Sequence, residues 1–380
     1  MENKNQRLHL LRTIFTPSGP VTDIERFSGR SSQVLKATGG ISQPGRHVVI
    51  YGERGVGKTS LSNVLVDAVA RIDRRLIGRA VRVNCTVDTT FGSLWSEAVT
   101  GLGLEAPPEW LHIRPNPEAI RHMLEKVEPP SAIIVDEYDR LEDDTALSLM
   151  ADTIKTLSDN LVRSKIVLVG VADTIDGLVG EHESVRRALE QVLIPRMSSQ
   201  EVSEVVTSGL DLAQMGISDT ALAEIARLAE GLPSYAHALP LEAATYATFD
   251  DRTIVEEGDI AAAVEEIVGG HTSRSSYLRA IRSPRRDNQF AAVLAACALA
   301  PKDDLGYFAP ADISGPLSNI LGRTVEISSF SRNLGSLMNE DRGSVLVRTG
   351  EARKYKYRFR DPMLQPFAVM AAMKAGLISS

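Results

Sequence analysis

Short β-branched runs alternate with segments of helical periodicity along the first half of the chain. Four of these runs predict strands: His47–Tyr51, Val81–Cys85, Ala132–Asp136 and Lys165–Gly170. The third run is apolar up to its last residue, which is typical of a strand buried on both faces of a parallel sheet. Strands that alternate with helices predict a right-handed α/β fold, a parallel sheet with helices on both faces.

From Ser198 onward the pattern changes to helices. Residues 198–268 are alanine-rich, have helical periodicity and contain no strand candidate, and residues 290–376 predict three helices, a hairpin and a final helix. The predicted organisation is an arm and helix at 1–45, an α/β domain at 46–197, a helical domain at 198–270, a basic linker at 271–289 and a C-terminal domain at 290–380.

A glycine-rich segment follows the first strand. The residues that match the phosphate-loop pattern G-x-x-x-x-G-K-[ST] are Gly52, Glu53, Arg54, Gly55, Val56, Gly57, Lys58 and Thr59, with Ser60 next in the helix that follows. Glycines let backbone N–H groups close around phosphates, and the positive end of the helix faces them. Lys58 is predicted to reach the β- and γ-phosphates of ATP, and Thr59 to hold Mg²⁺. A chance glycine turn is the alternative, but it leaves the flanking strand and helix unexplained.

Two acids end the third predicted strand. Asp136 emerges at its C-terminal end beside the phosphate loop, where a carboxylate suits Mg²⁺, held directly or through water. Glu137 is the adjacent carboxylate, suited to orient and polarise the attacking water. The alternative is a strand end with two solvated acids, which gives no reason for both sites to converge on one phosphate.

Composition limits the class of protein. Of the 380 residues, 43% are hydrophobic and 24% charged, as in soluble globular proteins. Cys85 and Cys297 lie in apolar surroundings, which argues against a disulfide framework or a zinc site. The start lacks the features of a signal peptide, and the run Phe290–Ala300 is too short to span a bilayer, so a cytoplasmic protein without a membrane partner is expected.

Charge is divided unevenly along the chain. Residues 271–380 carry 16 Lys and Arg against 9 Asp and Glu, whereas the preceding residues carry 26 against 40. A polyanionic partner is therefore expected at the C-terminal third.

The predicted C-terminal hairpin has one apolar and one cationic face. In the second strand, Tyr355, Tyr357 and Phe359 alternate with Lys354, Lys356, Arg358 and Arg360, and Val345–Arg348 predicts the partner strand. Before the hairpin, Ser328–Glu340 predicts a helix. Its apolar stripe is Phe330, Leu334, Leu337 and Met338, and its other face includes Arg332 and Asn333.

The run Asp136-Glu137-Tyr138-Asp139-Arg140-Leu141 resembles the origin-recognition and initiator branch of the AAA+ ATPases and the related STAND switch ATPases. Phe27–Arg30 ahead of the loop and Val83–Cys85 match the same families, and the chain is also similar to TniB-type transposition ATPases. The resemblance implies that Phe27 and Arg30 lie on the adenine side of the nucleotide pocket.

The resemblance also implies sensor residues. Asp173 stands where the γ-phosphate sensor is expected, although that position is usually Asn, Thr or Ser; a helix N-cap is the equal alternative. Arg187, or Arg186, is the candidate arginine finger acting on a neighbouring subunit's ATP, and a solvated helix face is the alternative. Ser234 occupies the position of the second sensor arginine, which implies slow hydrolysis.

Three helices and a hairpin at this end resemble a winged helix. Such a domain implies contact with duplex DNA, and the candidate residues are Arg332, Asn333, Arg353, Lys354, Lys356 and Arg358. Winged helices also bind proteins, so fold alone does not decide between the two.

Three hypotheses follow. The first is an ATP switch associated with DNA, acting as a homo-oligomer or with a partner ATPase. The second is a STAND-like signalling ATPase, for example in phage defence, or a TniB-like ATPase, whose C-terminal domain binds an effector protein. The third is an adaptor that binds ATP without turnover, against which Glu137 argues.

Overall fold

The computed structural model describes residues 2–25, 27–72, 77–141, 144–179, 183–283, 289–351 and 354–378. These residues form two compact units. Unit 1 comprises residues 1–19, 54–56 and 195–380, and unit 2 comprises residues 20–53 and 57–194. Among the described residues, no helix combines the length and the apolar character needed to cross a membrane.

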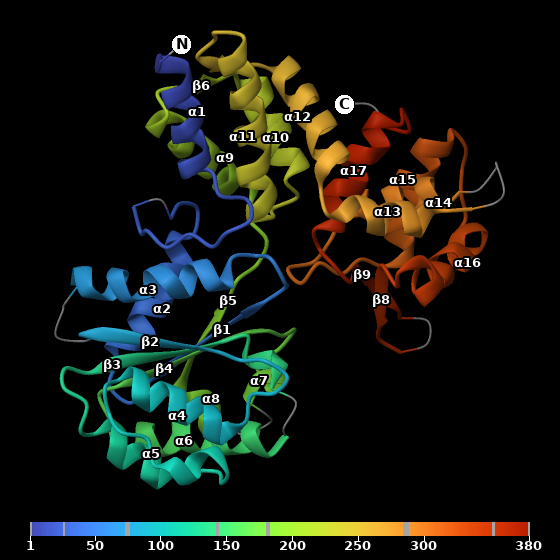
Figure 1. Cartoon of the computed structure of the whole chain (residues 1–380). Helices are drawn as coiled ribbons and strands as arrows, with labels where there is room; N and C mark the ends of the chain where they lie inside the picture. The colour runs from blue at the N-terminus through green and yellow to red at the C-terminus, as the bar shows by residue number, and fades with distance from the viewer. Residues whose placement is uncertain are drawn as a thin grey trace. The chain divides into compact units, whose positions relative to one another are not determined.

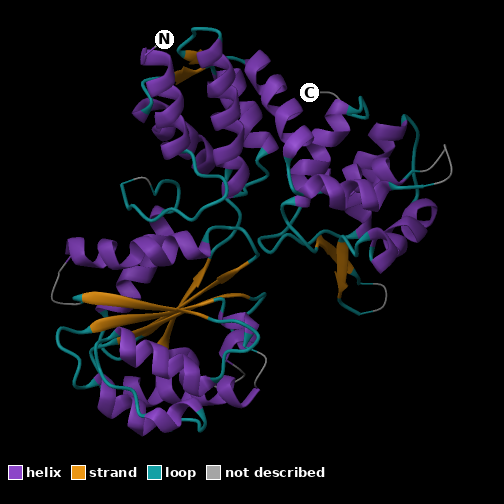
Figure 2. Cartoon of the chain, viewed as in Figure 1, coloured by secondary structure: helices purple, strands orange, loops and turns teal. Residues whose placement is uncertain are grey.

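Unit 2 is built on one parallel sheet (Figure 2). Its strands are β1 (His47–Gly52), β2 (Arg79–Asn84), β3 (Ser131–Asp136), β4 (Lys165–Val171) and β5 (Leu189–Leu193). Their order is β2-β3-β4-β1-β5, and every neighbouring pair is parallel. The four predicted strands are confirmed. Strand β5 was not predicted, because its sequence, with Glu190 and Gln191 at the centre, has neither a continuous apolar run nor strict alternation.

Helices cover both faces of this sheet (Figure 1). One face carries α2 (Ser31–Ser42) and α3 (Lys58–Ile72), and the other carries α4 (Phe91–Gly101), α5 (Pro117–Leu124) and α6 (Asp144–Asp159). The shorter elements are η1 (Pro108–Leu111), η2 (Tyr138–Arg140), α7 (Asp176–Val179) and α8 (Glu183–Ala188). The α4 side encloses a core that includes Phe91, Trp95 and Tyr138, all fully buried. The predicted α/β fold with helices on both faces of a parallel sheet is therefore correct.

Unit 1 begins with α1 (Glu2–Ile14), where the sequence predicted an irregular arm. It continues with α9 (Ser199–Leu212), α10 (Asp219–Leu228), α11 (Pro233–Phe249) and α12 (Glu257–Gly270). The prediction that residues 198–268 contain no strand is wrong, since β6 (Gly216–Ile217) and β7 (Ile254–Val255) form a two-residue parallel pair. A strand of two residues is too short to show an alternation of apolar and polar residues in the sequence.

The C-terminal part of unit 1 follows the predicted order of three helices, a hairpin and a helix. The elements are α13 (Ser273–Ile281), α14 (Phe290–Leu299), α15 (Pro310–Leu321), α16 (Ile327–Leu337), η3 (Glu340–Arg342), β8 (Leu346–Thr349), β9 (Lys356–Phe359) and α17 (Leu364–Lys374). Two details differ: residues 271–289, expected to be a linker, contain α13, and α16 ends before Glu340, at Leu337. A left-handed turn at Gly343 follows η3 and leads toward the hairpin.

The hairpin has the predicted alternation of faces. Tyr357 and Phe359 are buried, Lys354, Lys356 and Arg360 are exposed, and Tyr355 and Arg358 are half-buried. On α16, Phe330, Leu334 and Leu337 are buried and Arg332 is exposed.

Candidate functional site

The phosphate loop joins β1 to α3 through three glycines with positive φ. These are Gly52 (φ 148°), Gly55 (φ 82°) and Gly57 (φ 97°), conformations that other residues rarely adopt. A Cβ atom on Gly52 would lie 2.4 Å from the carbonyl oxygen of Ile194, so a larger residue does not fit. The sequence thus uses glycine where the backbone requires it, and the loop can present N–H groups to an anion at the start of α3.

Lys58 is folded back over this loop. Its Nζ donates hydrogen bonds to the carbonyl oxygens of Gly52 (3.1 Å) and Glu53 (2.7 Å), and its side chain is buried. Glu53 and Val56 are also buried, whereas Arg54 and Gly55 are exposed. The cation is thereby held against the loop that is predicted to receive the phosphates.

Asp136 is the last residue of β3, at the same edge of the sheet as the loop. Parallel strands end at one edge, and β4 alone separates β1 from β3. The carboxylate is buried, and both its oxygens accept hydrogen bonds. Oδ1 accepts one from the Glu137 N–H at 2.9 Å, and Oδ2 accepts one from Arg82 Nη1 at 2.6 Å.

Arg82, on β2, was not predicted as a site residue. Its Nη2 donates to Ser62 Oγ at 2.9 Å and to Asn63 Oδ1, both in the first turns of α3. Burial lowers the pKa of Arg82, and the charge and hydrogen bond of Asp136 partly offset this, but arginine remains a cation in proteins. The available signal was a cation between two apolar residues, Val81 and Val83, and its partner depends on strand order.

Glu137 has a left-handed backbone (φ 52°, ψ 36°), uncommon for a residue with a side chain. Its carboxylate is exposed, and Oε2 accepts a hydrogen bond from Arg140 Nη1 at 2.7 Å. Such conformations cost about 1–3 kcal/mol and concentrate at functional sites. The strain directs a carboxylate from the end of β3 toward solvent, next to Asp136.

The neighbouring acid, Asp139, fixes this turn to β4. Its Oδ1 accepts the Val171 N–H at 2.7 Å, at the end of that strand. Asp173 follows two residues later and its side chain is exposed. Helix α7 begins at Asp176, so two residues lie between Asp173 and the helix.

Other predicted nucleotide residues lie near the arm before α2. Ser60 Oγ accepts the Val21 N–H at 3.1 Å, and Asn63 Nδ2 donates to the Val21 carbonyl at 3.2 Å, so this arm is tied to α3. Phe27 is half-buried and Arg30 is buried. The finger candidates, Arg186 and Arg187, are both exposed on α8.

The serine predicted to stand in place of a second sensor arginine is hydrogen-bonded. Ser234 Oγ donates to the Pro17 carbonyl at 2.8 Å. The nearby His237 Nδ1 accepts the Thr16 N–H at 3.3 Å, and burial lowers the pKa of His237 to about 4. His237 is therefore a neutral, half-buried side chain that binds the N-terminal segment through Thr16.

The DNA candidates in unit 1 differ in their surroundings. Arg332 and Lys354 are exposed, and Asn333 is half-buried. Lys356 pairs with Asp303 at 2.9 Å, and the Arg358 guanidinium lies 4.6 Å from the centre of the Tyr307 ring. Arg353 lies outside the described residues.

The residues at the loop and at the end of β3 fit Mg²⁺. The two predicted ligands, the Thr59 hydroxyl and the Asp136 carboxylate, offer the oxygen atoms that this ion prefers. Asp136 is also buried and already faces a cation, so its surroundings are built for a positive charge. When bound, Mg²⁺ would neutralise phosphate charge.

Residues 41–178 match the family model described as an AAA domain. No curated protein is similar enough in sequence to match the chain. Among solved structures, a Walker-type ATPase of Pyrococcus abyssi has a TM-score of 0.54 at 16% identity, over 92% of this chain and 98% of that one.

Two further structures are similar over most of the chain. Cdc6p from Pyrobaculum aerophilum has a TM-score of 0.48 at 16% identity, over 97% of this chain and 99% of that one. The RuvB Holliday junction branch migration motor of Thermotoga maritima has a TM-score of 0.46 at 14% identity, over 94% and 98%. The family match and the first of the three structures establish an AAA+ P-loop ATPase fold.

Proposed function

We propose that this protein binds ATP with Mg²⁺ at the phosphate loop and the end of β3, hydrolyses it slowly, and acts as a nucleotide-dependent switch. In this role Lys58 and the loop N–H groups hold the phosphates, Thr59 and Asp136 hold Mg²⁺, and Glu137 orients the attacking water. Arg187 or Arg186 of a neighbouring subunit completes the site in an oligomer, and Asp173 contacts the γ-phosphate through a water or a cation.

One observation carries the proposal. Three glycines with positive φ bend the chain between a buried strand and a helix, and a lysine and a buried aspartate lie at the same sheet edge. A match of residues 41–178 to an AAA domain supports it independently. Slow turnover is proposed because Ser234, whose hydroxyl bonds to Pro17, has no positive charge to offer the phosphates.

Nucleotide binding is tested by calorimetric titration of the full chain with ATP and Mg²⁺. Lys58→Ala should abolish measurable binding, because it removes the cation and the side chain that spans the loop. The matched control is Lys155→Ala, an exposed lysine on α6 in the same unit. Unchanged ATP affinity in Lys58→Ala contradicts the proposal.

Turnover is tested with Glu137→Gln, which keeps the side-chain shape and removes the carboxylate. We expect roughly a hundredfold loss of phosphate release, the usual contribution of a positioned general base, with ATP binding retained. Glu118→Gln, an exposed acid on α5, is the control. Equal rates for wild type and Glu137→Gln favour the adaptor that binds ATP without hydrolysing it.

The proposed partner of the C-terminal hairpin and α16 is duplex DNA. Exposed Arg332 and Lys354 support it, together with the excess of basic residues in the C-terminal third. We further propose that residues 290–380 act as a winged helix, with α16 in the major groove and the hairpin over phosphates. An effector protein in place of DNA is the competing partner, and ATP-dependent assembly without DNA affinity would favour it.

A further inference from the structure

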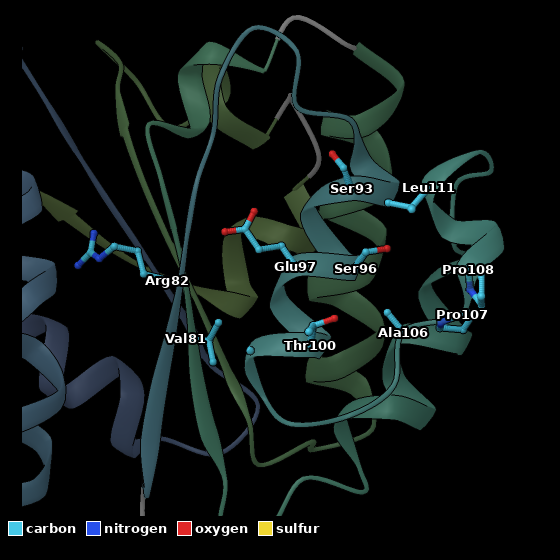
Figure 3. A pocket seen from close by; sticks show the side chains of 11 residues that line it. Val81, Arg82, Ser93, Ser96, Glu97, Thr100, Ala106, Pro107, Pro108 and Leu111 are labelled. Atoms are coloured by element: carbon cyan, nitrogen blue, oxygen red, sulfur yellow. The ribbon is translucent and has the colours of Figure 1, made fainter.

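Arg82, on β2, is among the residues that line a cavity of unit 2. That cavity has a volume of about 640 Å³ and lies between β2, α4 and residues 106–111. Figure 3 shows Val81 pointing toward α4, whereas the Arg82 guanidinium points away from it. Successive strand residues face opposite sides of a sheet, so Arg82 reaches α3 and the carboxyl end of β3.

The guanidinium joins Asp136, one of the two predicted magnesium ligands, to helix α3. It bonds directly to Asp136 Oδ2 at 2.6 Å, and to Ser62 Oγ at 2.9 Å. Ser62 Oγ in turn donates to the Thr59 carbonyl oxygen at 2.9 Å. Arg82 therefore places a positive charge on Asp136, the carboxylate that is predicted to hold Mg²⁺.

The bond to Asp136 and the metal are in competition. Asp136 Oδ1 accepts the Glu137 N–H and Oδ2 accepts the Arg82 guanidinium, so a metal ion on this carboxylate would be repelled by the positive charge of Arg82. A buried carboxylate needs a compensating positive charge at all times. We propose that Arg82 is the exchangeable counter-ion of Asp136: it neutralises the carboxylate when Mg²⁺ is absent and leaves Oδ2 when Mg²⁺ binds with ATP.

Hydrogen bonds connect Arg82 to the arm before α2, which is also part of unit 2. Its Nη2 also donates to Asn63 Oδ1, and the Asn63 amide donates to the Val21 carbonyl at 3.2 Å. The arm that begins at Val21 continues to Phe27 and Arg30, the predicted adenine side. Arg82 therefore links Asp136 to the arm through Asn63.

The test measures how strongly Mg²⁺ increases the affinity for ATP. The inference therefore rests on the proposed function. The quantity measured is the ratio of the ATP dissociation constant in EDTA to that in Mg²⁺, by calorimetry on the full chain. Arg82→Met keeps length and removes the charge. Because Mg²⁺ no longer has a competitor at Asp136, the ratio should rise about tenfold, the effect of one charge-assisted hydrogen bond.

Two controls make the result specific. Arg79 is a cation on the same strand, and it bonds to the Leu102 carbonyl instead of Asp136. The ratio of the two dissociation constants in Arg79→Met should therefore equal that of the wild type. In an Asp136→Asn background, Arg82→Met should leave the ratio unchanged. A normal ATP affinity with an unaltered ratio in Arg82→Met overturns this inference alone, whereas a wild-type protein that does not bind ATP overturns the proposed function with it.

A second measurement needs no variant. Crystal structures of the wild-type chain with an ATP analogue, with and without Mg²⁺, give the distance from Arg82 Nη1 to Asp136 Oδ2. We expect more than about 4 Å, the limit of an ion pair, when the metal is present. A distance that stays at 2.6 Å with bound Mg²⁺ overturns the inference.

Discussion

Single side chains in unit 2 show how burial sets charge. His47 opens β1 and is fully buried, and its Nδ1 accepts the Ile166 N–H of β4 at 3.0 Å. Nε2 then carries the proton, and within the described ranges it has no hydrogen-bond partner. Burial, with Lys165 nearby, lowers the pKa of His47 to about 3, so the ring is neutral throughout the physiological range.

A lowered histidine pKa makes stability depend on pH with a definite sign. The unfolded chain binds this proton below about pH 6.5 and the folded chain only near pH 3, so stability falls as pH decreases between these values. The loss should reach about 2 kcal/mol at about pH 5, and about 1.4 kcal/mol for each further pH unit.

The measurement is urea unfolding by tryptophan fluorescence, since both tryptophans lie in unit 2. His47→Asn keeps an acceptor for Ile166 and should lack this acid-dependent loss, whatever its stability at neutral pH. His112→Asn, an exposed histidine in the same unit, should follow the wild-type pH profile. An identical profile for wild type and His47→Asn contradicts the assignment.

The strands of the sheet differ in how clearly the sequence predicts them. Strands β1, β3 and β4 have continuous apolar runs at their centres, so their burial between helices is visible in the sequence. In β5 only Leu189 and Val192 are buried, and β5 stays in the sheet because it pairs with β1 along its length. Such pairing depends on the neighbouring strand β1, so it produces no periodic pattern of apolar residues in the sequence of β5.

The residues of the candidate site also differ in how well the sequence predicts them. The phosphate loop and Asp136 are contiguous motifs, so the sequence contains all the information needed to predict them. Arg82 meets Asp136, Ser62 and Asn63 across β2, β3 and α3, and this meeting depends on strand order and register. The contact of Arg82 with Asp136 can be predicted only once β2 is known to lie beside β3.

Helix α17 contains one buried polar residue whose loss can be measured. Gln365 is fully buried; its Oε1 accepts from Arg196 at 2.6 Å, and its Nε2 donates to Glu230 at 2.7 Å and to the Ala298 carbonyl at 3.0 Å. Gln365→Leu keeps the volume but removes these bonds from buried partners. We expect α17 to lose roughly 2 kcal/mol of opening free energy, about thirtyfold faster amide exchange.

The readout is hydrogen exchange of α17 peptides by mass spectrometry, because tryptophan fluorescence reports on unit 2 only. The control Gln200→Leu replaces an exposed glutamine on α9, in the same unit. If both variants protect α17 amides equally, the network of Gln365 with Arg196 and Glu230 does not stabilise the helix.

At the scale of the whole molecule, the charge asymmetry concerns the basic C-terminal third. Lys356 and Arg358 have partners inside unit 1, Asp303 and the Tyr307 ring, so their charges are partly committed. Arg332 and Lys354 are exposed and better placed to meet phosphates. We therefore expect the double variant Arg332→Ala, Lys354→Ala to weaken duplex DNA binding more than Lys356→Ala does.

Salt dependence separates phosphate contact from other causes of weaker binding. Each lost phosphate contact lowers the slope of log K against log salt by about 0.9, so the double variant should lower it by about 1.8. Anisotropy titrations with a labelled duplex at several salt concentrations measure this, and Arg12→Ala, an exposed arginine on α1, serves as control. An unchanged slope excludes both residues from the phosphate contact, and a wild-type protein without DNA affinity assigns this basic surface to a protein partner instead.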